Sequence, residues 1–366
     1  MTNISNSKKI LIYLNFLKSG AGKSAAAYAN ELIKNGYDVN VVSSISSPNI
    51  SGMLDRKINV NVTAAKTTYR KIQSLCVTLK EYNPDVVLVV GGGNAYVYLA
   101  ASLLSCTKSK LVIREAVSPK ILIESEDYYS IRILKKILLK KAYNKSEMVI
   151  SLTESMRNEI IKYWGVKEDR VALIPNGVVV PTRIHRAMGY SAIPIILNVG
   201  RLRPQKDHET LLRAFAIVRR ERPCCLVVAG DGNERERLKS IICELGIKSD
   251  VQLLGQVDDV SPLYRKASLT VLSSRYEGFP NVLIESFSHG CPVVATDCPT
   301  GPSEIIDSKD VGLLAEVGNP DDLAEKIILA LDRDYDLNKI LERANYFSIE
   351  RSNKKILELF ENLYEL

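Results

Sequence analysis

The fold of this chain is decided by one stretch, which reads Ser273-Ser274-Arg275-Tyr276-Glu277-Gly278-Phe279-Pro280-Asn281-Val282-Leu283-Ile284-Glu285. It follows an apolar segment, 269–272, and places seven residues between two glutamates. Pro280 suits the first position of a helix, and Gly290 with Pro292 suits its end, so we predict one short helix over 280–289. One carboxylate then lies in the loop and one on the helix, and each can accept hydrogen bonds from a pair of hydroxyl groups.

The predicted helix has a polar side and an apolar side. Asn281, Glu285 and Ser288 share one side at helical spacing, whereas Leu283 and Phe287 lie on the other side for packing. A glycine at position 278 lets the backbone approach a ligand closely. Two surface glutamates beside a helix cap are the alternative, but the spacing favours a site for a sugar ring and a ribose.

Short apolar segments alternate with amphipathic segments along the chain, as in parallel α/β units. Strands are predicted at 9–14, 38–43, 85–90, 110–114, 147–151 and 171–174, with helices at 22–35, 68–82, 95–104, 130–143 and 153–163. After a less periodic stretch, 175–194, strands are predicted at 195–199, 225–229, 251–254, 268–273, 292–296 and 311–315. We therefore predict an α/β protein with two Rossmann-like domains, followed by a helix near 348–366.

Composition and charge limit the class of protein and its partners. The chain has 366 residues, 46% of them hydrophobic and 25% charged, which is typical of a globular protein and excludes a disordered or fibrous one. Residues 1–182 carry 25 basic and 14 acidic side chains, whereas 183–366 carry 24 basic and 28 acidic. The first half is therefore expected to face an anionic partner, either nucleic acid or anionic lipid.

The remaining composition argues against a secreted protein or a metalloenzyme. No signal peptide or run of eighteen apolar residues is visible, so we expect a cytoplasmic protein without a membrane-spanning helix. Seven cysteines without metal or redox spacing are expected to be buried, reduced thiols. The three histidines, at 185, 208 and 289, have no companion at metal-ligand spacing, so we expect neither a catalytic metal nor a cofactor.

A glycine-rich turn, Gly20-Ala21-Gly22-Lys23-Ser24, follows the first predicted strand and ends like a phosphate-binding loop. A Walker loop needs a glycine five positions before Gly22, and position 17 is leucine. Such a turn still presents backbone N–H groups to an anion. A tight turn that serves only strand–helix packing is the alternative. The three glycines at 91–93 lack the spacing of a dinucleotide-binding fingerprint.

A cationic loop, Gly200-Arg201-Leu202-Arg203-Pro204-Gln205-Lys206, follows the predicted strand 195–199, and two of its cations, Arg201 and Lys206, are of interest. In open α/β sheets, ligands bind beyond the carboxyl ends of the strands. Arg201 and Lys206 are therefore placed to neutralise the charge that builds on a leaving diphosphate. Two solvated surface cations are the alternative.

These motifs together resemble the family 4 retaining glycosyltransferases of GT-B fold. The resemblance is carried by Gly200-Arg201-Leu202 with Lys206-Asp207, the Glu277-to-Glu285 motif, Ile174-Pro175-Asn176-Gly177-Val178 and Gly301-Pro302-Ser303-Glu304-Ile305-Ile306. It covers most of the chain and is looser in the first half, where that family binds acceptors. It implies an acceptor-side domain, 1–182, that faces a nucleotide-sugar-binding domain, 183–347, across a cleft. It also implies that the helix at 348–366 crosses back to the first domain.

The resemblance also implies roles for individual residues. Arg201 and Lys206 would bind the donor diphosphate, Glu277 the transferred sugar and Glu285 the ribose hydroxyls. Further donor contacts would come from Gly278, Phe279, Pro280, Asn281 and Val282, and, from the other domain, Gly20, Ala21 and Gly22.

The chain departs from the family's pattern at one strand end. Many relatives carry a histidine there, whereas this chain has Arg114-Glu115. We hypothesise that Arg114 contacts a donor or acceptor phosphate and that Glu115 positions the attacking hydroxyl. A salt-bridged structural role for both residues is equally open.

The function that the resemblance implies is metal-independent transfer, with retention, of a hexose or N-acetylhexosamine from a UDP-sugar. The acceptor would be a glycan or a lipid-linked glycan in bacterial surface-polysaccharide synthesis. The stretch 298–304 resembles members that use N-acetylhexosamines. A GT-B epimerase or phosphorylase and a nucleotide-binding protein without transferase activity are the alternatives.

A basic amphipathic helix is predicted at 131–141. Ile133, Leu134, Ile137 and Leu138 share one face with cations around them, which is typical of helices that lie in a membrane interface. We therefore predict peripheral binding to the anionic inner face of the plasma membrane, with a core helix that has a solvated basic side as the alternative. Nucleic acid is not an expected partner, because the basic residues are not interleaved with stacking aromatics.

Overall fold

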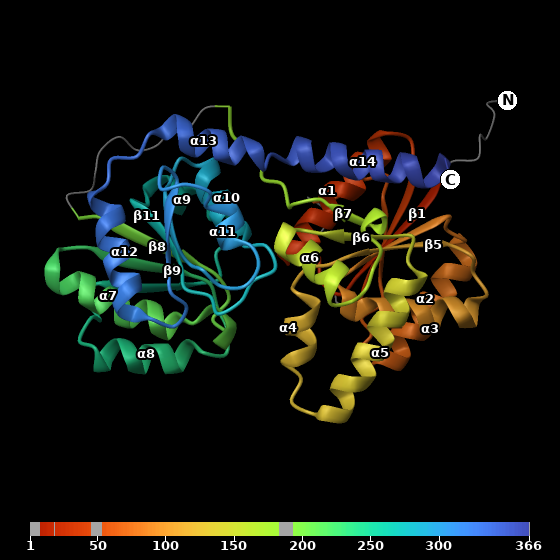
Figure 1. Cartoon of the computed structure of the whole chain (residues 1–366), viewed down its shortest axis with the longest axis horizontal. Helices are drawn as coiled ribbons and strands as arrows, with labels where there is room; N and C mark the ends of the chain where they lie inside the picture. Colours follow the sequence, from red (N-terminus) through yellow and green to blue (C-terminus); the bar gives the residue numbers. More distant parts are fainter. Residues whose placement is uncertain (1–7, 18, 45–52, 183–192, 366) are drawn as a thin grey trace. The chain divides into compact units, whose positions relative to one another are not determined.

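The computed structural model describes residues 8–17, 19–44, 53–182 and 193–365. Two compact units make up the chain (Figure 1): Met1–Gly177 with Glu350–Leu366, here called unit 1, and Val178–Ile349, called unit 2. The domain boundary expected after residue 182 falls at the edge of 183–192, and these residues lie outside the described structure. Lys18, just before the glycine-rich turn, also lies outside it. Each unit holds one parallel sheet, which confirms the predicted α/β class.

Unit 1 contains a seven-stranded sheet with the order β3-β2-β1-β4-β5-β6-β7. Its strands are β1 (Lys9–Leu14), β2 (Asp38–Ser43), β3 (Asn59–Val62), β4 (Val86–Val90), β5 (Lys110–Arg114), β6 (Met148–Ser151) and β7 (Val171–Leu173). The central strand β4 is apolar and buried throughout, as expected for a parallel strand that is covered on both faces. The edge strand β3 was missed from sequence, because it alternates asparagine with valine and is largely exposed.

The helices of unit 1 are α1 (Gly20–Lys34), α2 (Thr68–Tyr82), α3 (Gly92–Ser105), α4 (Pro119–Glu124), α5 (Tyr129–Lys145), α6 (Glu154–Lys162) and α14 (Ile349–Glu365), with a 3₁₀ turn at Glu168–Arg170. Helix α14 runs beside α1 in Figure 1. Its Ile356, Phe360 and Leu363 recur at helical spacing and are buried in the same core as Ala29 and Leu32 of α1. The last helix of the chain is therefore part of the core of unit 1.

Unit 2 contains a six-stranded sheet with the order β10-β9-β8-β11-β12-β13. Its strands are β8 (Ile195–Val199), β9 (Cys225–Ala229), β10 (Val251–Gly255), β11 (Leu269–Leu272), β12 (Val293–Thr296) and β13 (Gly312–Ala315). Its helices are α7 (His208–Glu221), α8 (Arg235–Glu244), α9 (Ser261–Lys266), α10 (Asn281–Ser288), α11 (Pro302–Ile305), α12 (Pro320–Asp332) and α13 (Leu337–Tyr346), with a 3₁₀ turn at Pro204–Lys206. Apolar side chains of α7, α8 and α12 share one core with the strands.

Strand order reverses once in each sheet, between β1 and β4 in unit 1 and between β8 and β11 in unit 2. The chain leaves β8 toward β9 and β10 and returns to pair β11 on the other side of β8. The loops that follow β8 and β11 therefore diverge from neighbouring strand ends, which is where open α/β sheets bind ligands.

Two expectations about composition can be compared with the structure. The expectation that every cysteine is buried was wrong: Cys106 and Cys243 are exposed, and Cys76 and Cys225 are partly exposed. Within the described ranges, no helix is both long enough and apolar enough to cross a bilayer.

Candidate functional site

The Glu277 carboxylate is the centre of the candidate site in unit 2. It lies in the loop after β11, and Glu277 is only 6% exposed. Its Oε1 atom accepts a hydrogen bond from Ser274 Oγ at 2.6 Å and pairs with Lys206 Nζ at 2.5 Å. A buried carboxylate is costly unless it is paired and hydrogen-bonded. Lys206, which follows β8, thus supplies the charge that allows Glu277 to be buried.

Hydrogen bonds to backbone carbonyls join the loops after β8 and β11. Ser273 Oγ donates to the Lys206 carbonyl at 2.9 Å, and Gln205 Nε2 donates to the Tyr276 carbonyl at 2.9 Å. The Arg275 N–H donates to the Gln205 carbonyl at 2.8 Å. The two loops are therefore held at fixed separation, and the Lys206–Glu277 pair is set by both.

Glycines allow the loop after β8 to lie against its other neighbour, the loop after β9. A Cβ atom on Gly230 would lie 1.7 Å from the Gly200 carbonyl oxygen, and one on Gly232 would lie 2.2 Å from the Leu202 oxygen. Only glycine fits at such approaches. Arg201, between these contacts, keeps an exposed side chain.

The loop after β12 closes on the Glu277 loop from the other side. Thr296 Oγ1 donates to the Ser274 carbonyl at 2.6 Å, and the Thr300 hydroxyl donates to the Glu277 carbonyl. Gly301 has φ +108°, and a Cβ atom there would lie 2.6 Å from Pro280 Cδ. The backbone from Glu277 to Pro280 is therefore clamped, which positions the segment 278–282 beside the carboxylate.

The second carboxylate, Glu285, lies on α10 and is partly exposed. Tyr264 donates a hydrogen bond from its hydroxyl to Glu285 Oε2 at 3.1 Å. Leu283 and Phe287 are buried as predicted, but Ser288 does not extend the polar side of the helix toward solvent. Ser288 is fully buried, and its hydroxyl donates to the Glu285 carbonyl at 2.8 Å. The helix begins at 281, with Pro280 as its N-cap.

The glycine-rich turn of unit 1 opens helix α1. Ser19 caps the helix by accepting the Gly22 N–H at 3.0 Å, and a Cβ atom on Gly22 would lie 2.1 Å from the Leu17 oxygen. Packing therefore accounts for Gly22, which is buried. Gly20 is exposed and Ala21 partly exposed, so these two residues are the accessible part of the turn.

Arg114 and Glu115 lie at the end of β5 and are 0% and 1% exposed. The Arg114 guanidinium donates to Asn176 Oδ1 and lies 5.8 Å from the centre of the Tyr28 ring. Glu115 accepts a hydrogen bond from Tyr143 OH at 2.7 Å and one from a backbone N–H of α3. Burial raises the pKa of Glu115 to about 7. This geometry favours the structural interpretation of the pair over direct substrate contact, although hydrogen bonds to Asn176 and Tyr143, rather than the expected salt bridges, hold the two side chains.

The Glu115 carboxylate explains one of the three glycines at 91–93, Gly92. Its Oε2 atom accepts the Gly92 N–H at 3.0 Å, and a Cβ atom on Gly92 would lie 2.5 Å from Oε1 of the same carboxylate. Gly91 adopts φ +85°, a conformation that glycine adopts readily. Gly92 thus serves internal packing, and Gly91 serves the local backbone geometry.

Several residues that build the site were not predicted from sequence. Ser274 and Thr300 bind Glu277, and Tyr264 binds Glu285. Ser274 and Thr300 are ordinary hydroxyl residues near strand ends, which is a signal too common to single them out. Tyr264 lies 21 residues before its partner, on a short helix. Nothing in the periodicity of the sequence relates the two.

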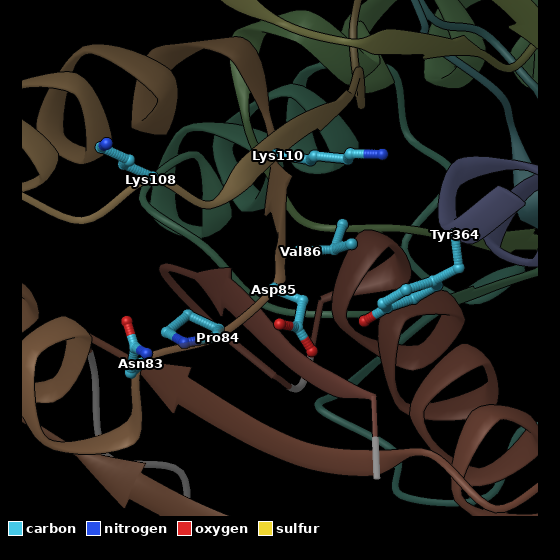
Figure 2. Close-up of a pocket in the computed structure, with 7 residues that line it drawn as sticks. All are labelled: Asn83, Pro84, Asp85, Val86, Lys108, Lys110 and Tyr364. Atoms are coloured by element: carbon cyan, nitrogen blue, oxygen red, sulfur yellow. The ribbon is translucent and has the colours of Figure 1, made fainter. Parts of the chain in front are cut away.

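A surface pocket elsewhere in unit 1 is shown in Figure 2. It is lined by Asn83, Pro84, Asp85, Val86, Lys108, Lys110 and Tyr364. It lies at the amino ends of β4 and β5, whereas ligands of such sheets bind at the carboxyl ends. Lys110 Nζ already donates to the Leu363 carbonyl at 2.6 Å. The loops of unit 2 therefore remain the candidate site.

The described residues include no group of three or more His, Cys, Asp or Glu side chains that could hold a metal ion. The site in unit 2 instead combines two cations with two carboxylates. Arg201 is exposed, and Lys206 pairs with Glu277. Such a set can bind an anionic ligand that also carries hydroxyl groups.

Comparison with known proteins assigns this chain to a class of enzyme. Residues 190–347 match the family described as "Glycosyl transferases group 1", and residues 18–180 match "Glycosyltransferase Family 4". The protein is therefore a glycosyltransferase with the GT-B fold. It belongs to the family 4 glycosyltransferases, as the sequence motifs predicted.

Individual relatives agree with this assignment. The chain is 28% identical to the N-acetylgalactosamine-N,N'-diacetylbacillosaminyl-diphospho-undecaprenol 4-alpha-N-acetylgalactosaminyltransferase of Campylobacter jejuni, over 65% of each protein. It is 27% identical to the amylovoran biosynthesis glycosyltransferase AmsD of Erwinia amylovora, over 84% of this chain and 86% of that protein. The crystal structure of Anabaena Alr3699/HepE in complex with UDP shares the fold, with a TM-score of 0.75, 19% identity and coverage of 97% and 100%.

A buried histidine next to the site gives a prediction about acid stability. His208 follows Lys206 by two residues and is 3% exposed, and neither of its ring nitrogens has a hydrogen-bond partner in the described structure. Burial, assisted by the charge of Lys206, lowers its pKa to about 4.

Because the unfolded chain binds a proton on His208 near pH 6.5 and the folded chain only near pH 4, stability falls as pH decreases through this window. We predict that His208→Leu reduces the loss of unfolding free energy between pH 7 and pH 4.5 by about 2 kcal/mol. Urea unfolding of both proteins at the two pH values measures this difference. Equal losses in the variant and the wild type would contradict the assignment.

Proposed function

We propose that this glycosyltransferase moves a hexose or N-acetylhexosamine from a UDP-sugar to a glycan or lipid-linked acceptor in surface-polysaccharide synthesis. Transfer is metal-independent and retains the anomeric configuration. The observation that carries the proposal is the Lys206–Glu277 pair, which lies between loops at the reversal point of the unit 2 sheet. The pair provides a cation for a diphosphate and an oriented carboxylate for a sugar hydroxyl.

The proposed roles follow from the contacts. Arg201 is exposed at the end of β8, and Lys206 lies in the same loop, so both can neutralise the diphosphate as it departs. Lys206 and Ser274 both bind Oε1 of Glu277, and this fixes the orientation of the carboxylate toward the transferred sugar. Glu285 accepts the ribose hydroxyls. Gly278, Phe279, Pro280, Asn281 and Val282 contribute backbone contacts.

The proposed reaction needs no covalent intermediate. A retaining double displacement requires a carboxylate for attack on the back face of the sugar. We assign Glu277 to a sugar hydroxyl instead, so the acceptor attacks on the face from which the diphosphate departs. Charge on that diphosphate is stabilised by Arg201 and Lys206 without a metal ion.

Relatives support the choice of donor and acceptor class. The Anabaena structure is a complex with UDP. The name of the Campylobacter enzyme gives a diphospho-undecaprenol glycan as its acceptor and N-acetylgalactosamine as the sugar transferred. The Erwinia enzyme is named for the biosynthesis of amylovoran. These names are consistent with a UDP-sugar donor and a lipid-linked acceptor for this chain.

Helix α5 supports a membrane-facing role for unit 1. Ile133, Leu134 and Ile137 are 42%, 55% and 48% exposed, whereas the buried residues of this helix are Leu139, Ala142 and Tyr143. The alternative of a core helix with a solvated basic side does not explain these exposed apolar side chains. Lysines 136, 140 and 141 are exposed on the same helix. We infer that α5 binds an anionic lipid surface, on the inner face of the plasma membrane, where a lipid-linked acceptor is presented.

Nucleotide binding tests the donor site. We predict that UDP raises the melting temperature with or without Mg²⁺, because a ligand that binds only the folded state stabilises it, by about 2.7 kcal/mol at a hundredfold excess over Kd. The shift should be smaller in Glu285→Ala, which loses the ribose contacts but keeps the diphosphate contacts, and smaller with GDP and ADP. A shift by ATP that requires Mg²⁺ would instead indicate a nucleotide site at the glycine-rich turn and overturn the proposal.

Removing the site cation tests the catalytic role. Lys206→Ala should lose about a hundredfold or more of kcat, because one group that stabilises developing charge is lost. Lys239→Ala, which removes an exposed lysine on α8, is the control and should keep wild-type kcat. Transfer is measured with the UDP-sugar selected by a donor screen, and folding by circular dichroism. A folded Lys206→Ala protein with nearly normal turnover would refute the role.

Vesicle binding tests the membrane proposal. The protein should bind vesicles of anionic phospholipid at low ionic strength and dissociate as salt is added, because screening weakens surface charge interactions. Glutamate at positions 136, 140 and 141 should abolish binding, and serine at 133, 134 and 137 should weaken it at every salt concentration. Glutamate at the exposed lysines 66, 80 and 354 is the matched control. Equal loss in the control, or no binding by the wild type, would contradict the proposal.

A further inference from the structure

The side chain of Tyr264 connects the interior of unit 2 to the second carboxylate. Tyr264 lies on α9 and is fully buried among Leu197, Ala267 and Cys291. Its hydroxyl donates to Glu285 Oε2 at 3.1 Å. Glu285 itself is only partly buried, so a rigid interior group holds a side chain that reaches the surface.

A second contact fixes the ring of Tyr264. The ring stacks on His289, with centres 5.5 Å apart and an angle of 22° between planes. His289 Nδ1 is in turn 2.9 Å from the Glu285 carbonyl oxygen. Tyr264 and the end of α10 are therefore locked to each other through both the side chain and the backbone of Glu285.

The chemistry of a buried phenol makes Tyr264 the hydrogen-bond donor in its contact with Glu285. A buried tyrosine hydroxyl needs a hydrogen-bond partner. Burial, together with the nearby Glu285 carboxylate, raises the pKa of Tyr264 well above its usual value, so the phenol stays protonated and donates. A carboxylate has about four acceptor positions, so a bond from Tyr264 leaves capacity for the two hydroxyls of a ribose.

We propose that Tyr264 is a positioning residue that holds the Glu285 carboxylate in the orientation required by the ribose hydroxyls of the donor. This inference rests on the proposed function, in which Glu285 binds that ribose. Without the phenol, the glutamate side chain loses one contact that orders it, and the ligand has to supply that part of the order at a cost in affinity. The cost should apply only to ligands that carry the ribose hydroxyls.

The test compares UDP with 2′,3′-dideoxy-UDP, which lacks both ribose hydroxyls, by isothermal titration calorimetry on the full chain. The wild type should prefer UDP, and Glu285→Ala should lose that preference. Tyr264→Phe keeps the ring and removes only the hydroxyl. It should weaken UDP binding about tenfold, the scale of one hydrogen bond to a charged group, and leave dideoxy-UDP unchanged. The double variant should resemble Glu285→Ala.

The control is Tyr98→Phe, which removes another buried phenol whose hydroxyl donates to a backbone carbonyl in unit 1. It should bind both nucleotides as the wild type does. Equal weakening of both nucleotides by Tyr264→Phe, or no weakening, would overturn the positioning role while leaving the ribose site intact. Retained preference for UDP in Glu285→Ala would instead refute the ribose assignment itself, and the positioning role with it.

Discussion

Parallel pairing of β11 with β8 is the constraint on which the site depends. Because these two strands are neighbours although β9 and β10 lie between them in sequence, their loops leave adjacent strand ends in different directions. The loops nevertheless stay close enough for a lysine of one to pair with a glutamate of the other. Glycines at 230 and 232 allow the loop after β9 to pack closely against the loop after β8, and the loop after β12 closes on the Glu277 loop from the opposite side.

The sequence predicted much of this arrangement, because the residues with the relevant chemistry follow the strands directly. Cations after β8 and the glutamate after β11 can be placed at one sheet edge as soon as both strands are recognised as parallel. The same reasoning did not distinguish Glu115 from Glu277. Both follow a strand, but Glu115 is turned inward to a tyrosine and a glycine N–H, whereas Glu277 is held by the cation of a second loop. Which way a carboxylate faces depends on residues distant in sequence.

Contacts between residues that are distant in sequence also explain the other differences between the predictions and the structure. Ser274 and Tyr264 are ordinary residues until the fold brings them to a carboxylate, and Thr300 is one until its hydroxyl meets the Glu277 carbonyl. Strand β3 is an exposed edge whose asparagines conceal its strand pattern. Helix α14 is predicted as a helix from its periodicity, but its own pattern does not tell which unit it completes; the family resemblance implies the first domain, and the helix packs in the core of unit 1. Local sequence patterns thus predicted the helices, strands and motifs, whereas the hydrogen-bond and packing partners of individual residues were visible only in the tertiary structure.

A crystal structure of the full chain with UDP tests the central claim most directly. The account predicts that the diphosphate lies against Arg201 and Lys206 in the loop after β8 and that the ribose hydroxyls contact Glu285. A nucleotide bound at the glycine-rich turn that opens α1, or in the pocket at the amino ends of β4 and β5, with the unit 2 loops unoccupied, would contradict it.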